Sequence, residues 1–165
     1  MGGPGGGGCG RHSGACEGLR KFVPERTNPH VERSMVIKMK LVIGGYAQGK
    51  LQYVLRKYHL REEAVWDGVL PDGEQIQTAM VVINHFHQWV RRSLLYGGCP
   101  EEEVRSFVDR CGDCIMISDE IGNGIVPVEA FEREYRDRTG RILIQLAKEA
   151  EEVERVLCGI GQKIK

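Results

Sequence analysis

A loop bounded by glycines follows an apolar stretch near residue 40 and has the spacing of a phosphate-binding site. Gly44 and Gly49 are separated by four residues, and Lys50 comes next. In such a loop the backbone N–H groups surround phosphate oxygens, and the lysine ammonium neutralises their charge. The pattern predicts binding of the phosphates of a nucleotide by Gly44, Gly45, Tyr46, Ala47, Gln48, Gly49, Lys50 and Leu51.

The residue after the lysine departs from this pattern. That position normally holds Ser or Thr, whose hydroxyl ligates the Mg²⁺ that accompanies the nucleotide. Leu51 occupies it here. Nucleotide binding therefore fits the sequence better than phosphoryl transfer does. The alternative is a tight turn between a strand and a helix, with an exposed lysine.

Two acidic positions follow other apolar stretches. Asp67 lies at the end of an expected strand, Val65-Trp66-Asp67. A carboxylate at such a position can bind Mg²⁺ directly or through water. The alternative is a turn, because aspartate before a glycine such as Gly68 commonly forms one. Glu120, preceded by Asp119, ends the run that begins at residue 114. Its carboxylate is a candidate catalytic group that holds a cation or orients a hydroxyl, and loop capping is the alternative.

Histidine and cysteine spacing suggests further chemistry less strongly. His85 and His87 are two residues apart on an expected helix, so they face different directions, and His87 is interpreted as a hydrogen-bonded core residue. Cys111 and Cys114 have the CxxC spacing of a zinc half-site or a redox pair. Because no second ligand pair at matching spacing accompanies them, ordinary thiols are favoured.

Strands and helices that alternate along the chain must position these groups. This alternation predicts an α/β fold with a mostly parallel sheet, helices on both faces, and ligands at the carboxyl ends of the strands. The expected strands cover residues 40–43, 64–69, 114–118 and 153–158, with 162–165 as a further candidate. The expected helices cover residues 49–58, 74–96, 100–111 and 127–149.

Composition limits the domain organisation and the partners. Residues 1–34 hold nine of the 22 glycines and are predicted to be a disordered tail, and residues 35–165 are predicted to form one nucleotide-binding domain. Met35 and Met39 precede the first strand, which favours one of them as the natural start; a tail native to the protein is the alternative.

The 23 basic residues balance the 23 acidic ones, so binding of nucleic acid is not expected. The sequence shows neither a membrane span nor a secretory leader, so a cytoplasmic protein is expected.

The C-terminal part of the chain, residues 121–165, closely resembles the bifunctional adenosylcobinamide kinase and adenosylcobinamide-phosphate guanylyltransferase family of cobalamin biosynthesis. The resemblance extends to the loop at residues 44–50 and, more loosely, to Asp67 and the segment around Trp89. It is carried by Glu120, Gly122, Gly124, Ile125, Val126, Pro127, Arg136, Asp137, Gly140, Arg141, Gln145, Gly159 and Ile160.

This resemblance implies a RecA-like P-loop NTPase fold, often assembled as a homo-trimer, that uses GTP or ATP with Mg²⁺. It also implies phosphorylation of a corrinoid substrate, adenosylcobinamide, followed by GMP transfer through a guanylylated histidine. Only 14 residues separate Lys50 from Val65, where family members carry a longer segment with that histidine. His59 is the one histidine in this gap and is a weak candidate, and Asp119 stands where the family has asparagine.

Two hypotheses follow from these residues. The first is a shortened family member that binds a nucleoside triphosphate and phosphorylates adenosylcobinamide, with Lys50 and Glu120 as catalytic groups and Asp67 near the metal. The second is a nucleotide-binding or interaction protein that keeps the fold without catalysis. The absence of a hydroxyl at Leu51 fits the second hypothesis.

Overall fold

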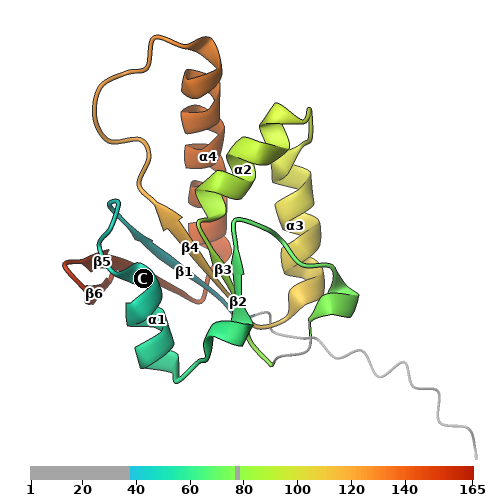
Figure 1. Ribbon diagram of the computed structural model, residues 1–165, viewed down its shortest axis with the longest axis vertical. Coiled ribbons are helices and arrows are strands. Elements are labelled where there is room, and N and C mark those ends of the chain that lie inside the picture. The colour runs from blue at the N-terminus through green and yellow to red at the C-terminus, as the bar shows by residue number, and fades with distance from the viewer. Residues whose placement is uncertain (1–37, 77–78) are drawn as a thin grey trace, which may run out of the picture. The chain divides into compact units, whose positions relative to one another are not determined.

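One mixed sheet of six strands lies at the centre of the computed structural model, which describes residues 38–76 and 79–165 (Figure 1). The predicted tail at residues 1–34 lies outside the described residues. The spatial order is β2-β3-β4-β1-β5-β6, and only β5 and β6 pair antiparallel. The strands are β1 (Met39–Gly44), β2 (Val65–Asp67), β3 (Val81–Asn84), β4 (Cys114–Asp119), β5 (Glu152–Leu157) and β6 (Ile160–Lys163).

Helices cover both faces of this sheet. Val54 of α1 (Lys50–Tyr58) packs with Val42 and Val82 on one face. Helices α2 (Phe86–Leu95), α3 (Pro100–Cys111) and α4 (Ala130–Glu149) pack on the other face, and Figure 1 shows them grouped apart from α1. The predicted α/β fold with a mostly parallel, doubly covered sheet is therefore confirmed.

Burial on both faces explains the composition of the central strands. Every residue of β3 and β4 is buried, and alternate residues of β1 face the two helical layers. A parallel strand covered on both faces reads as an almost continuous apolar run rather than as an alternation of polar and apolar residues. The runs Val81-Val82-Ile83 and Ile115-Met116-Ile117 have this character.

Helix α3 begins where its sequence indicates. Pro100 occupies its first turn, and three glutamates follow at residues 101–103. Proline has no N–H to leave unsatisfied there, and carboxylates favour the positive end of the helix dipole. Arg138 of α4 pairs with Glu101, which lowers the pKa of that carboxyl through the hydrogen bond and links the two helices. None of the helices in the described ranges is long and apolar enough to cross a membrane.

The helix predicted over residues 74–96 is wrong in its first half, and its second half is confirmed as helix α2. A short 3-10 turn at Gly73–Gln75 and strand β3 (Val81–Asn84) precede helix α2, which begins at Phe86. Between Met80 and Val90, apolar residues recur at steps of three and four, which is the spacing expected for one apolar face of a helix. The run of β-branched residues at 81–83 favours a strand instead, because their stiff side chains pack well on a pleated sheet.

His87 is a buried core residue, as its place in the apolar pattern indicated. Its Nδ1 accepts a hydrogen bond from the backbone N–H of Asp119, which ties α2 to the end of β4. Burial lowers the pKa of His87, and the nearby Asp119 carboxylate opposes that shift in part. The imidazole therefore stays neutral in the folded protein at neutral pH.

Side chains of α1 anchor this helix to the sheet. The Tyr53 hydroxyl and the Lys57 ammonium lie 2.9 Å and 2.7 Å from Oε1 of Glu154, a buried residue of β5. Burial, followed by the hydrogen bond to Glu154, raises the pKa of Tyr53. Because α1 begins at Lys50, these contacts also fix the start of the helix where the predicted phosphate loop ends.

The end of β1 should tolerate no side chain. A Cβ atom at Gly44 would lie 2.4 Å from the Val156 carbonyl oxygen. We expect Gly44→Ala to lower the free energy of unfolding by about 1–3 kcal/mol through overpacking. Urea unfolding followed by circular dichroism measures the change. Gly140→Ala is the matched control, because its Cβ would meet open space on α4 and should leave stability equal or higher. Equal effects of the two substitutions would contradict the close approach of β1 and β5.

The lowered pKa of His87 predicts a pH dependence of stability. A histidine whose pKa is lower in the folded state contributes fully above its unfolded pKa of about 6.5, and this contribution is lost as pH falls toward the folded value. The free energy of unfolding should therefore fall more between pH 7 and pH 5 in the wild type than in His87→Gln. His59→Asn, at the exposed end of α1, should follow the wild type. Identical falls in His87→Gln and the wild type would refute the neutral buried state.

Candidate functional site

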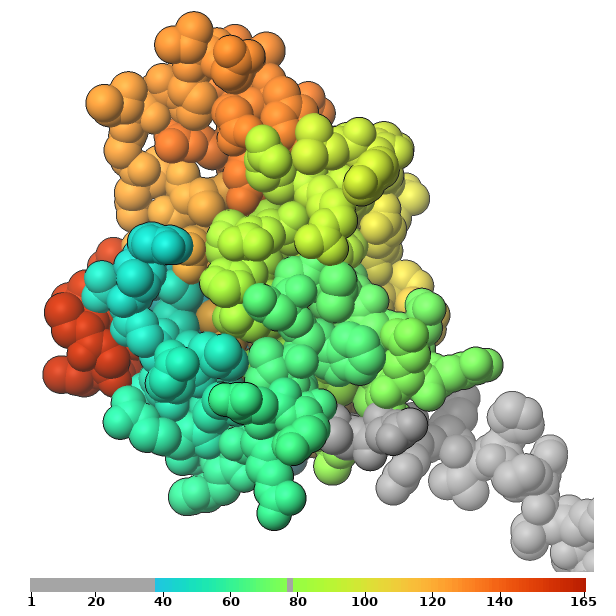
Figure 2. Space-filling view, viewed as in Figure 1, coloured from blue at the N-terminus to red at the C-terminus, as the bar shows by residue number. Residues whose placement is uncertain are grey.

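The carboxyl ends of the parallel strands meet at one edge of the sheet and form a cleft. Gly44 of β1 lies beside Asp119 of β4 in register, and β3 ends next to β4 at Asn84. In Figure 2 the loop after β1 and the start of α2 lie on the same viewed face. The cleft has a volume of about 260 Å³ and is lined by Tyr46, Ala47, Gln48, Gly49, Lys50, Leu51, Gln52, Asn84, His85 and Asp119.

The loop over residues 44–50 presents the start of a helix to this cleft. Gly49 has a φ of 77°, a left-handed conformation that suits glycine, and α1 begins at the next residue. The first backbone hydrogen bond of the helix runs from the N–H of Tyr53 to the Gly49 carbonyl. No side chain caps the N-terminus of α1. The first N–H groups of a helix have no intrahelical partner, and together with the helix dipole they favour an anion.

Two hydrogen bonds attach the loop to the turn between β5 and β6. The Gln48 side-chain oxygen accepts the N–H of Cys158 at 2.7 Å, and the Gln48 carbonyl accepts the N–H of Gly159 at 2.9 Å. These two bonds fix the position of the loop relative to the turn after β5.

Lys50 lies inside the cleft, with only 7% of its surface exposed. Its ammonium donates to the Gly45 carbonyl at 2.7 Å and lies 2.5 Å from Oδ1 of Asp119. The lysine that the sequence singled out is therefore placed beside the loop amides. A carboxylate already balances its charge.

Asp67 lies at the edge of the site rather than within the cleft. It ends β2, three strands from β1, which corresponds to about 14 Å at a strand spacing of about 4.8 Å. Its Oδ1 accepts the Asn84 side-chain amide at 2.8 Å and lies 2.5 Å from Nδ1 of His85. Both partners line the cleft, so Asp67 reaches it through them. A role of Asp67 in metal binding stays a prediction.

Glu120 and His59, the other sequence candidates, are not brought to the cleft lining. The Glu120 carboxylate pairs with two guanidinium nitrogens of Arg155, each at 2.8 Å, although its backbone N–H donates to the Gly44 carbonyl. His59 caps the far end of α1, about 13 Å along the helix from Lys50. The roles predicted for these two side chains would require a rearrangement or a different site.

The donors around the cleft fit Mg²⁺ poorly. Leu51 supplies no hydroxyl, and its side chain packs against the apolar cluster that contains Val54. Among the described residues, Asp119 is the one carboxylate that lines the cleft, and it is already paired with Lys50. In the described part of the chain, no group of three or more His, Cys, Asp or Glu residues could hold a metal. The side chains of the cleft are therefore not a set of ligands that would hold Mg²⁺ by themselves.

Three residues that line the cleft are not among the site residues that the sequence predicts, namely Gln52, Asn84 and His85. The sequence pattern places Asn84 and His85 in the middle of a helix, whereas they end β3 and precede α2. His85 has a φ of 49°, a left-handed conformation that turns the chain sharply at this point. The β-branched run at residues 81–83 is the signal that indicates a strand end at Asn84. Of the two carboxylates expected at the end of β4, the structure brings Asp119 into the cleft.

The CxxC pair lies apart from the cleft. Cys111 ends α3 and Cys114 begins β4, and both thiols are free. A hydrogen bond with Cys111 and burial raise the pKa of the Cys114 thiol. The same hydrogen bond lowers the pKa of the Cys111 thiol, so the two thiols shift in opposite directions, and neither of them lines the cleft.

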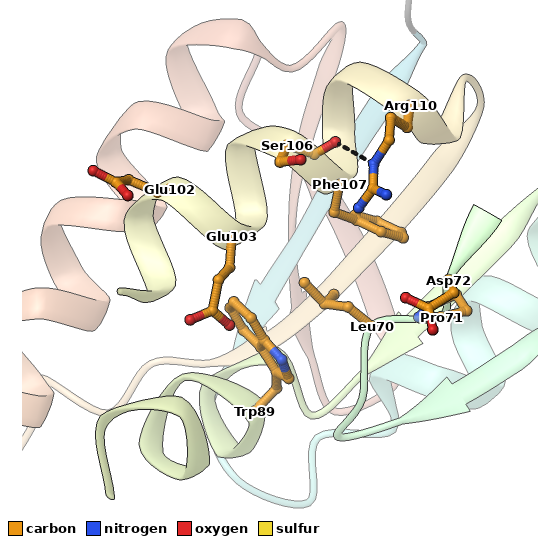
Figure 3. A pocket seen from close by; sticks show the side chains of 9 residues that line it. All are labelled: Leu70, Pro71, Asp72, Trp89, Glu102, Glu103, Ser106, Phe107 and Arg110. Carbon is orange, nitrogen blue, oxygen red and sulfur yellow. Dashed lines mark hydrogen bonds between the residues drawn. The ribbon is translucent and has the colours of Figure 1, made fainter. Parts of the chain in front are cut away.

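A larger hollow of about 440 Å³ lies elsewhere, between the segment after β2 and helices α2 and α3 (Figure 3). Leu70, Trp89 and Phe107 contribute apolar side chains to it. Two charged groups at its rim are already bound within the fold: Arg110 donates to the Ser106 carbonyl, and Glu103 accepts from the Ser93 hydroxyl and the Cys99 N–H. None of the predicted phosphate-loop residues lines this hollow, so the cleft at the strand ends is the candidate site.

Comparison with known proteins identifies a family for this chain. The family model described as cobinamide kinase / cobinamide phosphate guanyltransferase matches residues 55–164, which is more than half of the chain and begins after the phosphate loop. A relative from Escherichia coli (strain K12), the bifunctional adenosylcobalamin biosynthesis protein CobU, is 42% identical over 67 residues, covering 38% of this chain and 37% of the relative. The protein of the same name from Salmonella typhimurium is 38% identical over 69 residues, covering 39% of this chain and 38% of the relative.

The matched parts thus amount to less than two fifths of either curated relative. The family match and the six-stranded α/β sheet agree with a P-loop NTPase fold. The chain belongs to the cobinamide kinase / cobinamide phosphate guanyltransferase family.

Proposed function

We propose that this protein binds a nucleoside triphosphate, GTP or ATP, with its phosphates against residues 44–51. The observation that carries the proposal is the buried Lys50 ammonium beside the uncapped start of α1. Loop amides and an ammonium together offer hydrogen-bond donors and positive charge to phosphate oxygens. The cleft volume of about 260 Å³ suits the phosphates, with the base and ribose extending beyond it.

The proposed reaction is phosphoryl transfer to adenosylcobinamide in cobalamin biosynthesis, in keeping with the family. Lys50 and the loop amides stabilise charge on the transferred phosphoryl group. Mg²⁺ accompanies the nucleotide, held mainly by phosphate oxygens and water, as is common for this ion. Guanylyl transfer is left out of the proposal, because His59, the histidine between Lys50 and Val65, lies at the far end of α1.

The proposal includes a cytoplasmic setting and assembly into a homo-oligomer, with a trimer as the form that family resemblance favours. Ten large apolar side chains are exposed in the described residues, and Ile125, Val126 and Val128 lie in the loop that extends away from the sheet after β4 (Figure 1). Exposed apolar groups gathered on one segment are typical of protein contacts.

A second function rests on a specific observation. Leu51 packs into the core instead of offering a hydroxyl, and the one carboxylate in the cleft is bound to Lys50. Both features favour a protein that binds nucleotide without catalysis. It would keep the fold and the phosphate loop as a recognition site.

Removing the Lys50 ammonium tests nucleotide binding. We expect Lys50→Ala to weaken GTP or ATP binding by about tenfold or more, the factor that one hydrogen bond between charged groups commonly contributes. Isothermal titration calorimetry gives the affinity. Lys163→Ala removes the same charge from exposed β6 and should bind like the wild type. Equal affinities of Lys50→Ala and the wild type would contradict the proposed site.

Turnover separates the two proposed functions. If the protein is a kinase, incubation with adenosylcobinamide, GTP or ATP, and Mg²⁺ should yield adenosylcobinamide phosphate by mass spectrometry, and Lys50→Ala should abolish the product. Nucleotide binding that is indifferent to Mg²⁺ and yields no product would support the non-catalytic function. A phosphorylated product that persists in Lys50→Ala would contradict phosphoryl transfer at this cleft.

A further inference from the structure

The Lys50 ammonium is occupied before any ligand arrives. Its closest partner is Oδ1 of Asp119 at 2.5 Å, and the two side chains are 7% and 11% exposed. A pair so shielded from water interacts more strongly than a surface pair, because solvent screens it less. The carboxylate and the Gly45 carbonyl together take up two of the three N–H donors of the ammonium, and the carboxylate balances its charge.

Surrounding contacts keep Asp119 in this position. Its backbone N–H donates to Nδ1 of His87, and its second oxygen lies 3.7 Å from Nε2 of the same ring. Register with Gly44 fixes the backbone of Asp119 beside the phosphate loop. Strand β4 fixes the backbone of Asp119, and His87 of α2 contacts both its backbone and its carboxylate. The contact between Asp119 and Lys50 is therefore part of the folded structure.

We propose that Asp119 competes with phosphate for the Lys50 ammonium and thereby lowers the affinity of the cleft for phosphate groups. A phosphate that binds the ammonium must displace this carboxylate or share the ammonium with it. A neutral amide in place of the carboxylate would leave the ammonium charge unbalanced and available to a phosphate. The inference rests on the proposed nucleotide function for its ligand, and it assigns this control of affinity to one residue.

Chemical labelling tests the hold on Lys50 without any nucleotide. Acetic anhydride acetylates free amines, and peptide mass spectrometry gives the rate at each lysine. We expect Asp119→Asn to accelerate acetylation of Lys50 by about tenfold, the factor expected when one hydrogen bond between charged groups is lost. Asp137→Asn is the matched control, because it makes the same chemical change and breaks an exposed ion pair with Arg141 on α4. It should leave the Lys50 rate unchanged.

Binding of inorganic tripolyphosphate, inorganic phosphate and GTP by calorimetry tests the competition. Asp119→Asn should bind tripolyphosphate and GTP about tenfold more tightly than the wild type and Asp137→Asn, and its affinity for phosphate should not fall. Circular dichroism of each variant confirms that the fold is retained. If Asp119→Asn fails to fold, Asp119→Ser provides the same test with a smaller neutral side chain.

The outcomes distinguish this inference from the proposed function. Equal GTP affinity in the wild type and Asp119→Asn would overturn the competition and leave nucleotide binding standing. Binding only after Asp119→Asn would support the competition and contradict nucleotide binding by the natural sequence. An unchanged Lys50 acetylation rate in Asp119→Asn would overturn the inference. Absence of triphosphate binding in both proteins would overturn it together with the proposed function.

Discussion

The ion pair between Lys50 and Asp119 joins the ends of the two central strands through one buried contact. Lys50 begins α1 directly after the loop that leaves β1, and Asp119 ends β4. Because β1 and β4 pair in register from residue 39 to residue 44, the two side chains are delivered to the same point at the sheet edge. A shift of this register by one residue would turn one of the side chains to the other face of the sheet. The cleft therefore depends on strand pairing more than on the loop sequence alone.

Several separate contacts hold the segments around the cleft in place. Gln48 holds the loop to the turn after β5, Glu154 anchors α1 through Tyr53, and His87 accepts from the Asp119 backbone. Each of these contacts joins segments distant in sequence, and each costs little conformational entropy once the sheet is formed. The result is a preformed cleft, which suits recognition of a ligand whose phosphates need several donors at fixed positions.

Sequence patterns predicted the elements that have strong local signals. The loop at Gly44 to Lys50, the proline-led helix α3 and the apolar strand β4 all have such signals, and all occur close to their expected bounds. The segment around Val82 was misread, because a short buried strand next to a helix mixes two periodicities within ten residues. That error concealed Asn84 and His85 as residues of the cleft.

Side-chain pairing lay beyond sequence patterns for a physical reason. The partner of Lys50 is 69 positions away in sequence, and strand order alone brings it near. The same holds for Glu120, which the sequence placed at a strand end but whose carboxylate turns to Arg155 of β5. Sequence spacing predicts the sheet edge at which a carboxylate lies. Which of the nearby lysine or arginine side chains pairs with that carboxylate depends on packing in three dimensions.

A crystal structure with a bound nucleoside triphosphate would show directly whether the cleft holds phosphate. We expect phosphate oxygens within hydrogen-bonding distance of the Lys50 ammonium and of the backbone N–H groups at the start of α1, with the ammonium moved away from the Asp119 carboxylate. A nucleotide bound elsewhere, with Lys50 still paired to Asp119, would contradict phosphate binding by this loop.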